Sequence, residues 1–388
     1  DNRSIMTCFK EKENPMKLNP LRSVGKAIAG LSLLVSAQAL SSPANYTLTT
    51  IAENLDHPWA VTQLPDQSFL VTERTGQLLR VTADGSTQVI EGVPASYFAG
   101  QGGLLDVVLH PEFDSNQRIY LSYAHGTPDA NATAITRATL KGDQLVDADQ
   151  ILLVQPMKDT PQHYAGRMLF LPDGTLLVTV GEGFDYREKS QDIENEMGKI
   201  LRIMDDGSVP ADNPFSGDNS RRIWSYGHRN AQGLVHDADS GKVYMHEHGP
   251  RGGDEINVVS PGKNYGWPAI THGRDYNGAH VSPFTAAEGM EQPLLHWTPS
   301  IAPSSMALYT GDHFPQWRGD LLVGALVDKE VRRVDLEDGK VVAQESLFRE
   351  LDARIREVRM GVDGHLYLLT DGEGGKLLRV SPAKAPQQ

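Results

Sequence analysis

A pattern of turn, short strand, turn and second strand recurs along this chain and constrains its fold more than any other feature. Each copy opens on residues such as Asp, Asn, Gly or Pro, which favour turns and bound β-rich runs. Almost no long stretch after residue 45 has a helical period. Six copies occur, with starts 47 to 79 residues apart, at Asp66, Phe113, Pro172, Asp237, Gln316 and Asp363.

This recurrence predicts an all-β fold, a six-bladed β-propeller of four-stranded antiparallel blades. Each blade needs about 50 to 60 residues, which residues 40–388 provide. A pair of β-sandwiches is the alternative, but it would have shorter and more even loops. We expect the glycine-rich excursions 181–198 and 266–293 to lie on the face of the propeller and to build its site.

The first 39 residues differ from the rest of the chain. Residues 16–39 (MKLNPLRSVGKAIAGLSLLVSAQA) hold three basic residues, an apolar stretch and a final Ala-Gln-Ala. This pattern predicts a cleaved signal peptide, so 1–39 would be an upstream segment plus the signal, and 40–388 a single exported propeller domain. A membrane anchor or buried helix is the alternative, but the apolar stretch is well short of the roughly 20 residues of a membrane span.

Amino-acid composition and net charge limit the kinds of molecule that this protein is expected to bind. The one cysteine, Cys8, lies in the predicted discarded part, so the propeller would have no disulfide. A net charge of −14 argues against nucleic acid, which needs a basic surface. The charge suits neutral sugars, metal ions or small cationic carriers, and solubility alone explains it equally well. The motifs typical of nicotinamide, ATP and α/β-hydrolase sites do not occur.

Three loop positions could serve a binding site. His163 precedes the strand-like MLFL and could act as a general base near neutral pH, or be a surface or hydrogen-bonding histidine. Gln101 begins a Gln-Gly-Gly sequence that allows close approach of a ligand, although a plain turn between blades explains it as well. Arg229, followed by Asn230, could hold a carboxylate or quinone oxygen, or bond loop carbonyls.

The segment 223–268 holds the other candidates, and it is typical of a surface for a flat anionic cofactor and a hard metal ion. His246, Glu247 and His248 alternate as zinc ligands can, but no third ligand has a recognised spacing. The carbonyls of Gly249 and Pro250 suit calcium better. Glu255 could add a carboxylate and Tyr265 a backbone carbonyl, although Glu255 could also be a solvated carboxylate at a strand end.

Arg354 and Arg356 alternate, so both guanidinium groups can project to one face of an extended segment. Two adjacent cations repel unless an anion sits between them. An exposed edge strand protected by charge is the alternative.

Taken together, these motifs resemble the soluble quinoprotein glucose dehydrogenases, and within them the periplasmic aldose sugar dehydrogenases. The resemblance covers nearly all of 46–381. It is carried, in order, by QGGLLD with HPEF, His163 with Gly166-Arg167, MGKILR, GHRNAQG, EHGP, DEIN, NYGWP and Arg354-Ile-Arg356.

The resemblance implies a six-bladed propeller that binds pyrroloquinoline quinone (PQQ) and calcium and oxidises aldose sugars at C1 to the lactone. His163 would be the general base, while hydride passes from C1 to C5 of the quinone. Arg229 would polarise the quinone carbonyl, and Asn230 would assist it. Electrons would leave to a small acceptor or carrier, from a monomer or homodimer.

The remaining ligand roles also follow from the resemblance. The carbonyls of Gly249 and Pro250 would hold the calcium that grips PQQ. Glu255 and Tyr265 match positions that the aldose dehydrogenases use for a calcium ion. The PQQ carboxylates or ring oxygens would contact Gln101, Arg354 and Arg356, with Tyr276 near the cofactor.

The chain departs from the family pattern at two positions. His248 stands where the glucose dehydrogenases have a glutamine, and Val327 stands where they have a lysine that reaches PQQ. Lys329, two residues on and on the same face of the expected strand, could replace that cation. Two other functions stay open: a calcium-dependent lactonase, which needs converging carboxylates, and a non-catalytic propeller that binds a glycan or protein partner.

Overall fold

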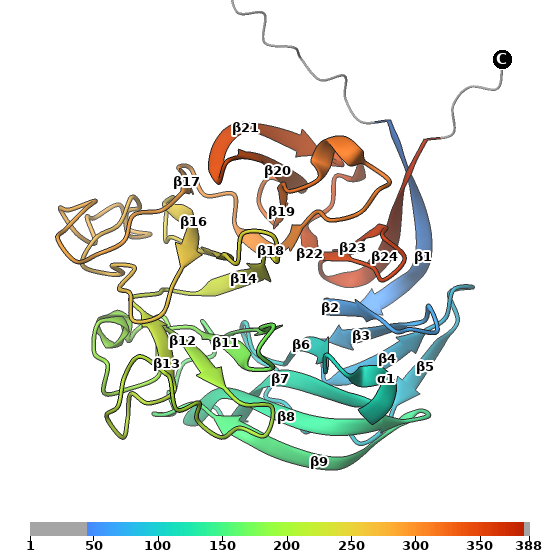
Figure 1. Cartoon of the computed structure of the whole chain (residues 1–388), viewed down its shortest axis with the longest axis horizontal. Helices are drawn as coiled ribbons and strands as arrows, with labels where there is room; N and C mark the ends of the chain where they lie inside the picture. The colour runs from blue at the N-terminus through green and yellow to red at the C-terminus, as the bar shows by residue number, and fades with distance from the viewer. Residues whose placement is uncertain (1–44, 384–388) are drawn as a thin grey trace, which may run out of the picture. The chain divides into compact units, whose positions relative to one another are not determined.

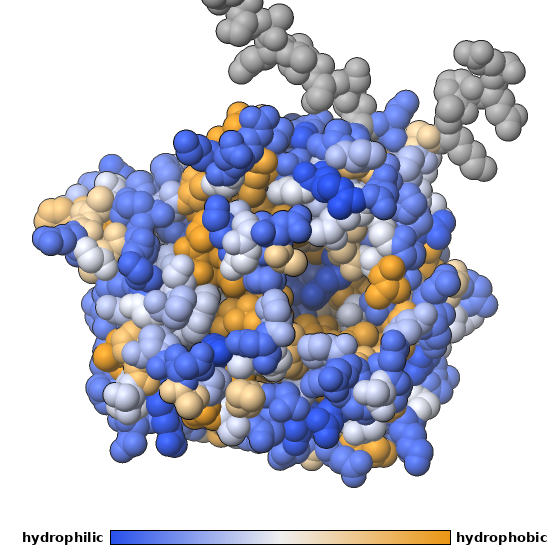
Figure 2. All heavy atoms as spheres, in the orientation of Figure 1, coloured by the Kyte–Doolittle hydropathy of each residue, from blue (hydrophilic) through white to orange (hydrophobic). Residues whose placement is uncertain are grey.

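The fold is a six-bladed β-propeller, as predicted. The computed structural model describes residues 45–383, so the predicted signal peptide at 16–39 lies outside the described residues. Six four-stranded antiparallel sheets account for all 24 described strands. The sheets stand around a common centre, where the molecule is hollowed and hydrophilic residues lie at the bottom (Figures 1 and 2).

The blades are numbered in the order in which their innermost strands occur along the chain. Blade 1 comprises β2 (Pro58–Gln63), β3 (Phe69–Glu73), β4 (Gln77–Val81) and β5 (Thr87–Ile90). Blade 2 comprises β6 (Leu104–Leu109), β7 (Arg118–Thr127), β8 (Ala130–Lys141) and β9 (Gln144–Leu153). Blade 3 comprises β10 (Ala165–Phe170), β11 (Leu176–Val180), β12 (Lys199–Ile203) and β13 (Ile223–Tyr226).

The second half of the ring repeats this order. Blade 4 comprises β14 (Ala231–His236), β15 (Val243–Glu247), β16 (Asp254–Val259) and β17 (Leu295–Trp297). Blade 5 comprises β18 (Pro303–Leu308), β19 (Leu321–Ala325), β20 (Glu330–Glu337) and β21 (Lys340–Leu347). Blade 6 comprises β22 (Ile355–Met360), β23 (Leu366–Thr370), β24 (Glu373–Pro382) and β1 (Tyr46–Asp56).

Among residues 45–383, helix is confined to single turns. These are α1 (Phe113–Asn116) and the 3₁₀ turns η1 (Arg187–Ser190), η2 (Pro315–Trp317) and η3 (Arg349–Leu351). None of the helices in 45–383 has the length and hydropathy to cross a bilayer.

The ring closes because its first strand completes the last blade. β1 pairs antiparallel with β24, with Tyr46 opposite Pro382 and Leu48 opposite Val380, and Figure 1 shows the blue strand beside the red one. The inner strands β2, β6, β10, β14, β18 and β22 pack on one another in sequence around the axis. Apolar side chains between successive blades form the core, for example Leu104 and Leu121 with Leu70 and Leu78. This packing keeps the blade ends, where the loops start, in fixed positions.

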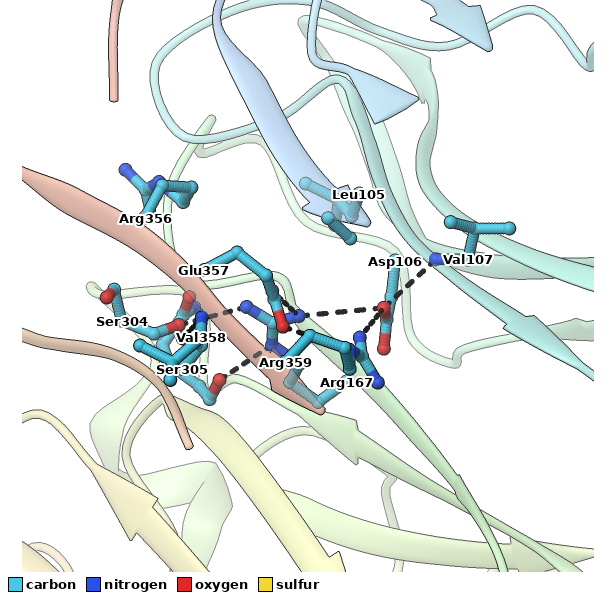
Figure 3. Close-up of polar contacts among 12 residues, drawn as sticks. Leu105, Asp106, Val107, Arg167, Ser304, Ser305, Arg356, Glu357, Val358 and Arg359 are labelled. Carbon is cyan, nitrogen blue, oxygen red and sulfur yellow. Dashed lines mark hydrogen bonds and ion pairs between the residues drawn. The ribbon is translucent and has the colours of Figure 1, made fainter. Parts of the chain in front are cut away.

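A buried ionic cluster, here called the axial cluster, joins the inner strands (Figure 3). It consists of Asp106 on β6, Arg167 on β10, and Glu357 and Arg359 on β22. Its two cations balance its two anions, as buried charges require.

Arg167 links its own blade to all five others. Its guanidinium group contacts the ring of Trp59 (4.0 Å to the centroid), Asp106 Oδ1 (3.5 Å), the carbonyl oxygens of Gln232 (2.7 Å) and Ser304 (3.1 Å), and the carboxylate of Glu357. The buried side chain of Arg167 therefore contacts all five other blades at the centre of the ring.

Candidate active site

A cavity of about 610 Å³ opens where the inner strands begin. Side chains at or next to the first residues of the inner strands line it, among them Trp59, Leu105, Ala165, Gln232 and Ala302. Loops supply the rest, so the cavity takes its shape from rigid strands and its chemistry from loops, as is usual for binding sites.

His163 lies on this cavity, almost fully buried, in the loop that leads into β10. Its Nδ1 is 3.0 Å from Oε2 of Glu182, which follows β11 and is also buried. Its backbone N–H donates to Oε1 of Gln101 (2.9 Å). Burial lowers the pKa of His163, and the hydrogen bond to Glu182 offsets this only in part. A neutral imidazole that donates Nδ1–H to a carboxylate keeps Nε2 as an acceptor, and no hydrogen bond to a described residue engages Nε2.

Glu182 is a site residue that the sequence analysis missed. It stands in the predicted excursion 181–198, and its carboxylate also accepts a hydrogen bond from the backbone N–H of Phe184. The available signal was its position, directly after a buried strand and between two glycines.

Arg229 lies in the loop that leads into β14, where it lines the cavity and is buried, and its carbonyl oxygen accepts from the backbone N–H of Glu182 (2.9 Å). Its Nη1 donates to the carbonyl oxygens of His248 (3.3 Å) and Gly249 (3.1 Å). Its Nη2 is 3.4 Å from the hydroxyl of Tyr276. Its Nε is buried without a hydrogen-bond partner among the described residues. The guanidinium group of Arg229 is therefore fixed by hydrogen bonds at Nη1, while its buried Nε–H can still donate to an oxygen ligand.

Two neighbours of Arg229 were also predicted as ligands. Asn230 is buried and lines the cavity, and its Oδ1 accepts from the backbone N–H of Ala165 (3.2 Å). Tyr276 stands at the rim with 56% of its surface exposed, and its ring stacks on Phe184 at 6.1 Å.

The structure places Arg354 and Arg356 side by side, with the anion between them that their alternation called for. Asp371 accepts from Arg354 Nε (2.8 Å) and Arg356 Nε (2.9 Å). Burial alone would raise the pKa of Asp371, but the two guanidinium groups, Arg356 first, lower it below its usual value. The alternative of an exposed edge strand is therefore wrong for Arg356, which is mostly buried.

The charge of the cavity is opposite to that of the chain. Five arginines line it, Arg74, Arg229, Arg251, Arg354 and Arg356, whereas Asp371 is the one carboxylate among the described lining residues. The whole chain has a net charge of −14. A cationic cavity in an acidic protein is typical of a site for a multiply charged anion.

The residues predicted to bind metal fall in two places. Gly249 and Pro250 line the cavity. Glu255 and Tyr265 instead line a pocket of about 10 Å³ beside it, together with Glu247. Glu247 and Glu255 are directly opposite on β15 and β16. Burial, and then the charge of Glu247, raise the pKa of Glu255 to about 8.

No three His, Cys, Asp or Glu side chains within 45–383 group as a metal site. His246 is fully buried with both ring nitrogens unpaired, and burial lowers its pKa to about 3. His248 lines the cavity, and burial also lowers its pKa. The described residues therefore give no support to zinc at these two histidines.

The suggestion that Lys329 replaces the cation missing at Val327 is wrong. Val327 lines the cavity, but residues 326–329 form a turn, so strand alternation does not apply there. Lys329 Nζ pairs with Asp352 at 2.8 Å and does not line the cavity. Arg74, from blade 1, contributes a cavity cation that the sequence analysis missed.

Fold and cavity together define a β-propeller with an arginine-lined cavity that includes His163 of a buried histidine–carboxylate pair. Comparison with known proteins places it in a family. The family profile described as Glucose / Sorbosone dehydrogenase matches residues 55–379. The chain belongs to this family of oxidoreductases.

Individual relatives agree with this assignment. The chain is 41% identical to aldose sugar dehydrogenase YliI of Escherichia coli, over 90% of this chain and 96% of that protein. It is 28% identical to quinoprotein glucose dehydrogenase B of Acinetobacter calcoaceticus, over 90% of both chains.

Solved structures show the same likeness. The apo form of the soluble aldose sugar dehydrogenase from Escherichia coli has a TM-score of 0.84 at 40% identity, covering 87% of this chain and 100% of that one. The PQQ-bound aldose sugar dehydrogenase from Streptomyces coelicolor has a TM-score of 0.71 at 28% identity, covering 87% and 99%.

Proposed function

We propose that this protein is a PQQ- and calcium-dependent aldose sugar dehydrogenase that oxidises the sugar at C1 to the lactone. One observation carries the proposal: a cavity lined by five arginines and one aspartate also holds a buried histidine, His163, that is hydrogen-bonded to a buried carboxylate. The relatives named above as quinoproteins or PQQ-bound enzymes support the choice of cofactor.

The cavity residues fit a flat tricarboxylate such as PQQ. The unpaired Nε of Arg229 is a buried donor that a quinone or carboxylate oxygen would satisfy. Arg354, Arg356 and Gln101 offer further donors to carboxylates or ring oxygens, and Asn230 and Tyr276 flank Arg229. Arginine favours such planar oxygen groups because its fork donates two parallel hydrogen bonds.

His163 would act as the general base. Its Nε2 takes the proton of the C1 hydroxyl, and Glu182 stabilises the imidazolium that forms, because the carboxylate stays hydrogen-bonded to Nδ1. Bound PQQ supplies a quinone carbon that accepts the C1 hydrogen as hydride. Proton and hydride together leave the sugar as its lactone. Arg229 would hold the oxygen on which negative charge develops.

Calcium would bind through oxygen ligands. We assign the carbonyls of Gly249 and Pro250 to an ion that holds the cofactor, and Glu255 and Tyr265 to an ion in the adjacent pocket. Glu255 faces Glu247, and burial and the charge of Glu247 raise the pKa of Glu255 to about 8. A divalent ion between the two groups would offset the cost of ionising both.

The alternatives fit the cavity less well. A lactonase would need converging carboxylates, and Asp371 is the one carboxylate of the described lining. A non-catalytic propeller leaves the buried His163–Glu182 pair without a role. We further propose export to the periplasm and transfer of electrons to a small acceptor or carrier.

The test is His163→Asn. We expect it to lower kcat by about 10²- to 10⁴-fold, the usual contribution of a general base, while PQQ affinity, measured by fluorescence titration, stays within about twofold. His125→Asn, outside the cavity, is the matched control. Full turnover in His163→Asn would refute the base assignment.

A further inference from the structure

Lys158 is a buried lysine next to the histidine–carboxylate pair, and the reaction proposed above gives it no role. It is 5% exposed, and its Nζ donates to Asn131 Oδ1 (2.8 Å) and to the carbonyl of Thr160. The Nζ also lies 3.6 Å from the centre of the Tyr164 ring. No carboxylate of the described residues lies within 4.0 Å of it. A buried ammonium group without a direct ion pair is costly, so its retention calls for a reason.

Its contacts join the two segments that carry the pair. Tyr164 follows His163, and its hydroxyl donates to the same Asn131 Oδ1 (2.6 Å) that Lys158 contacts. Thr160 donates its hydroxyl to the carbonyl of Gly183, the residue after Glu182 (2.6 Å).

The stem of Lys158 packs on the second segment directly. A Cβ at Gly183 would lie 2.7 Å from Lys158 Cδ. Glycine is therefore needed at 183, where φ is +80° and the stem leaves no room for a side chain. Lys158 thus fixes the spacing between the residues that flank His163 and Glu182.

Its charge also acts on the pair. A cavity of about 10 Å³, roughly one water in size, is lined by both Lys158 and His163. The charged and titratable groups that face His163 are Glu182, Arg229, Lys158 and His248. Glu182 favours protonation of His163, whereas the cations Arg229 and Lys158 oppose it. Such interactions are strong in a dry interior.

We propose that Lys158 is a positioning residue of the His163–Glu182 pair, which holds the two side chains at hydrogen-bonding distance and places a positive charge beside them. This rests on the proposed function in that the reaction uses His163 as its base. Burial lowers the pKa of Lys158 itself to about 7, so the lysine is charged over the range in which His163 titrates.

Three variants separate charge from packing. Lys158→Met keeps the stem and removes the charge, Lys158→Gln keeps a hydrogen-bond donor without charge, and Lys158→Arg keeps the charge. Lys199→Met is the matched control, because Lys199 is equally buried and its Nζ donates to the carbonyls of Lys189, Ser190 and Met197. It does not line the cavity.

The first measurement is an NMR titration of the His163 ring in protein without PQQ, assigned with His163→Asn. We expect the pKa of His163 to rise by on the order of one unit in Lys158→Met and Lys158→Gln, and to stay near wild type in Lys158→Arg and Lys199→Met. Lys158→Gln decides the matter if Lys158→Met does not fold.

The second measurement is the pH profile of kcat/KM in PQQ-loaded enzyme. Its acidic limb should move upward by the same amount in the uncharged variants, and Lys158→Arg should restore it. The proposal would be overturned if the pKa of His163 stayed unchanged in Lys158→Met or Lys158→Gln. If such a variant also lost thermal stability as Lys199→Met does, the role of Lys158 would be structural. The NMR result stands even if the protein proves not to use PQQ.

Discussion

Replacing Arg167 by Met tests whether the axial cluster holds the six blades together. The substitution keeps a similar buried volume and removes the guanidinium group that contacts Asp106, Glu357 and two backbone carbonyls. Removing one partner of a buried ion pair costs about 3–5 kcal/mol, and the lost contact with Trp59 (4.0 Å) adds to this.

Arg359 moderates the loss. It stays 3.1 Å from both Asp106 Oδ1 and Glu357 Oε1, so neither carboxylate is left without a cation. We therefore expect a loss of about 4 kcal/mol in the free energy of unfolding. With an unfolding entropy of about 2.1 cal/mol/K per residue, a domain spanning 44–388 loses about 6 °C in Tm.

A double-mutant cycle makes the prediction specific. Arg167→Met with Glu357→Met removes one charge of each sign and leaves the Asp106–Arg359 pair. The double variant should be more stable than the sum of the single losses by about 2 kcal/mol. Calorimetry at pH 7 is the assay, and Arg318→Met, which breaks an exposed pair with Asp312, is the control with an expected change below about 1 kcal/mol. A Tm loss in Arg167→Met no larger than in Arg318→Met would refute the reasoning.

Three further predictions concern single residues. His246 has a pKa of about 3 in the fold and about 6.5 in the unfolded chain. As the pH falls below about 6.5, the unfolded chain binds the proton first, so His246 lowers the free energy of unfolding by up to ~1.4 kcal/mol per pH unit. His246→Met should remove this pH dependence in urea titrations between pH 4 and 7, and an unchanged slope would contradict the prediction. Arg356→Met should weaken PQQ about 10- to 100-fold, the value of a buried charged hydrogen bond, while the half-exposed Arg354→Met should weaken it less; equal losses in titration would contradict the burial argument. Glu255→Gln should stabilise the calcium-free protein at pH 8, because a carboxyl group with a raised pKa opposes folding above its unfolded pKa. It should also lower the gain in Tm that calcium gives to PQQ-free protein, and an unchanged gain would place that ion away from Glu255.

The sequence was sufficient to predict the fold class, because the turns and strands of each blade are encoded in short stretches of sequence. The six recurring turns precede β3, β7, β11, β15, β19 and β23, the second strand of every blade. Turn chemistry and alternation are readable over short windows. The closing pair of β1 and β24 was not predicted, because pairing between the two ends of a chain leaves no local signal.

The site was predicted where a motif carried it. His163, Gln101, Arg229, Asn230, Arg354 and Arg356 all line one cavity, as do Gly249, Pro250 and Tyr276. Glu255 and Tyr265 lie in the adjacent pocket instead. The sequence analysis missed residues whose contacts are with segments distant in the sequence. Glu182 and Asp371 have roles only because β11 and β23 end beside His163 and Arg356, and Lys329 was misplaced because a turn interrupts the strand.

The measurement that tests the central claim most directly is a titration of purified, metal-free protein with PQQ and calcium, with glucose-driven reduction of an electron-accepting dye as the readout. We predict saturable activity that requires calcium and reaches its maximum near one PQQ per chain. Absence of quinone binding, or dye reduction that is independent of PQQ, would contradict the account.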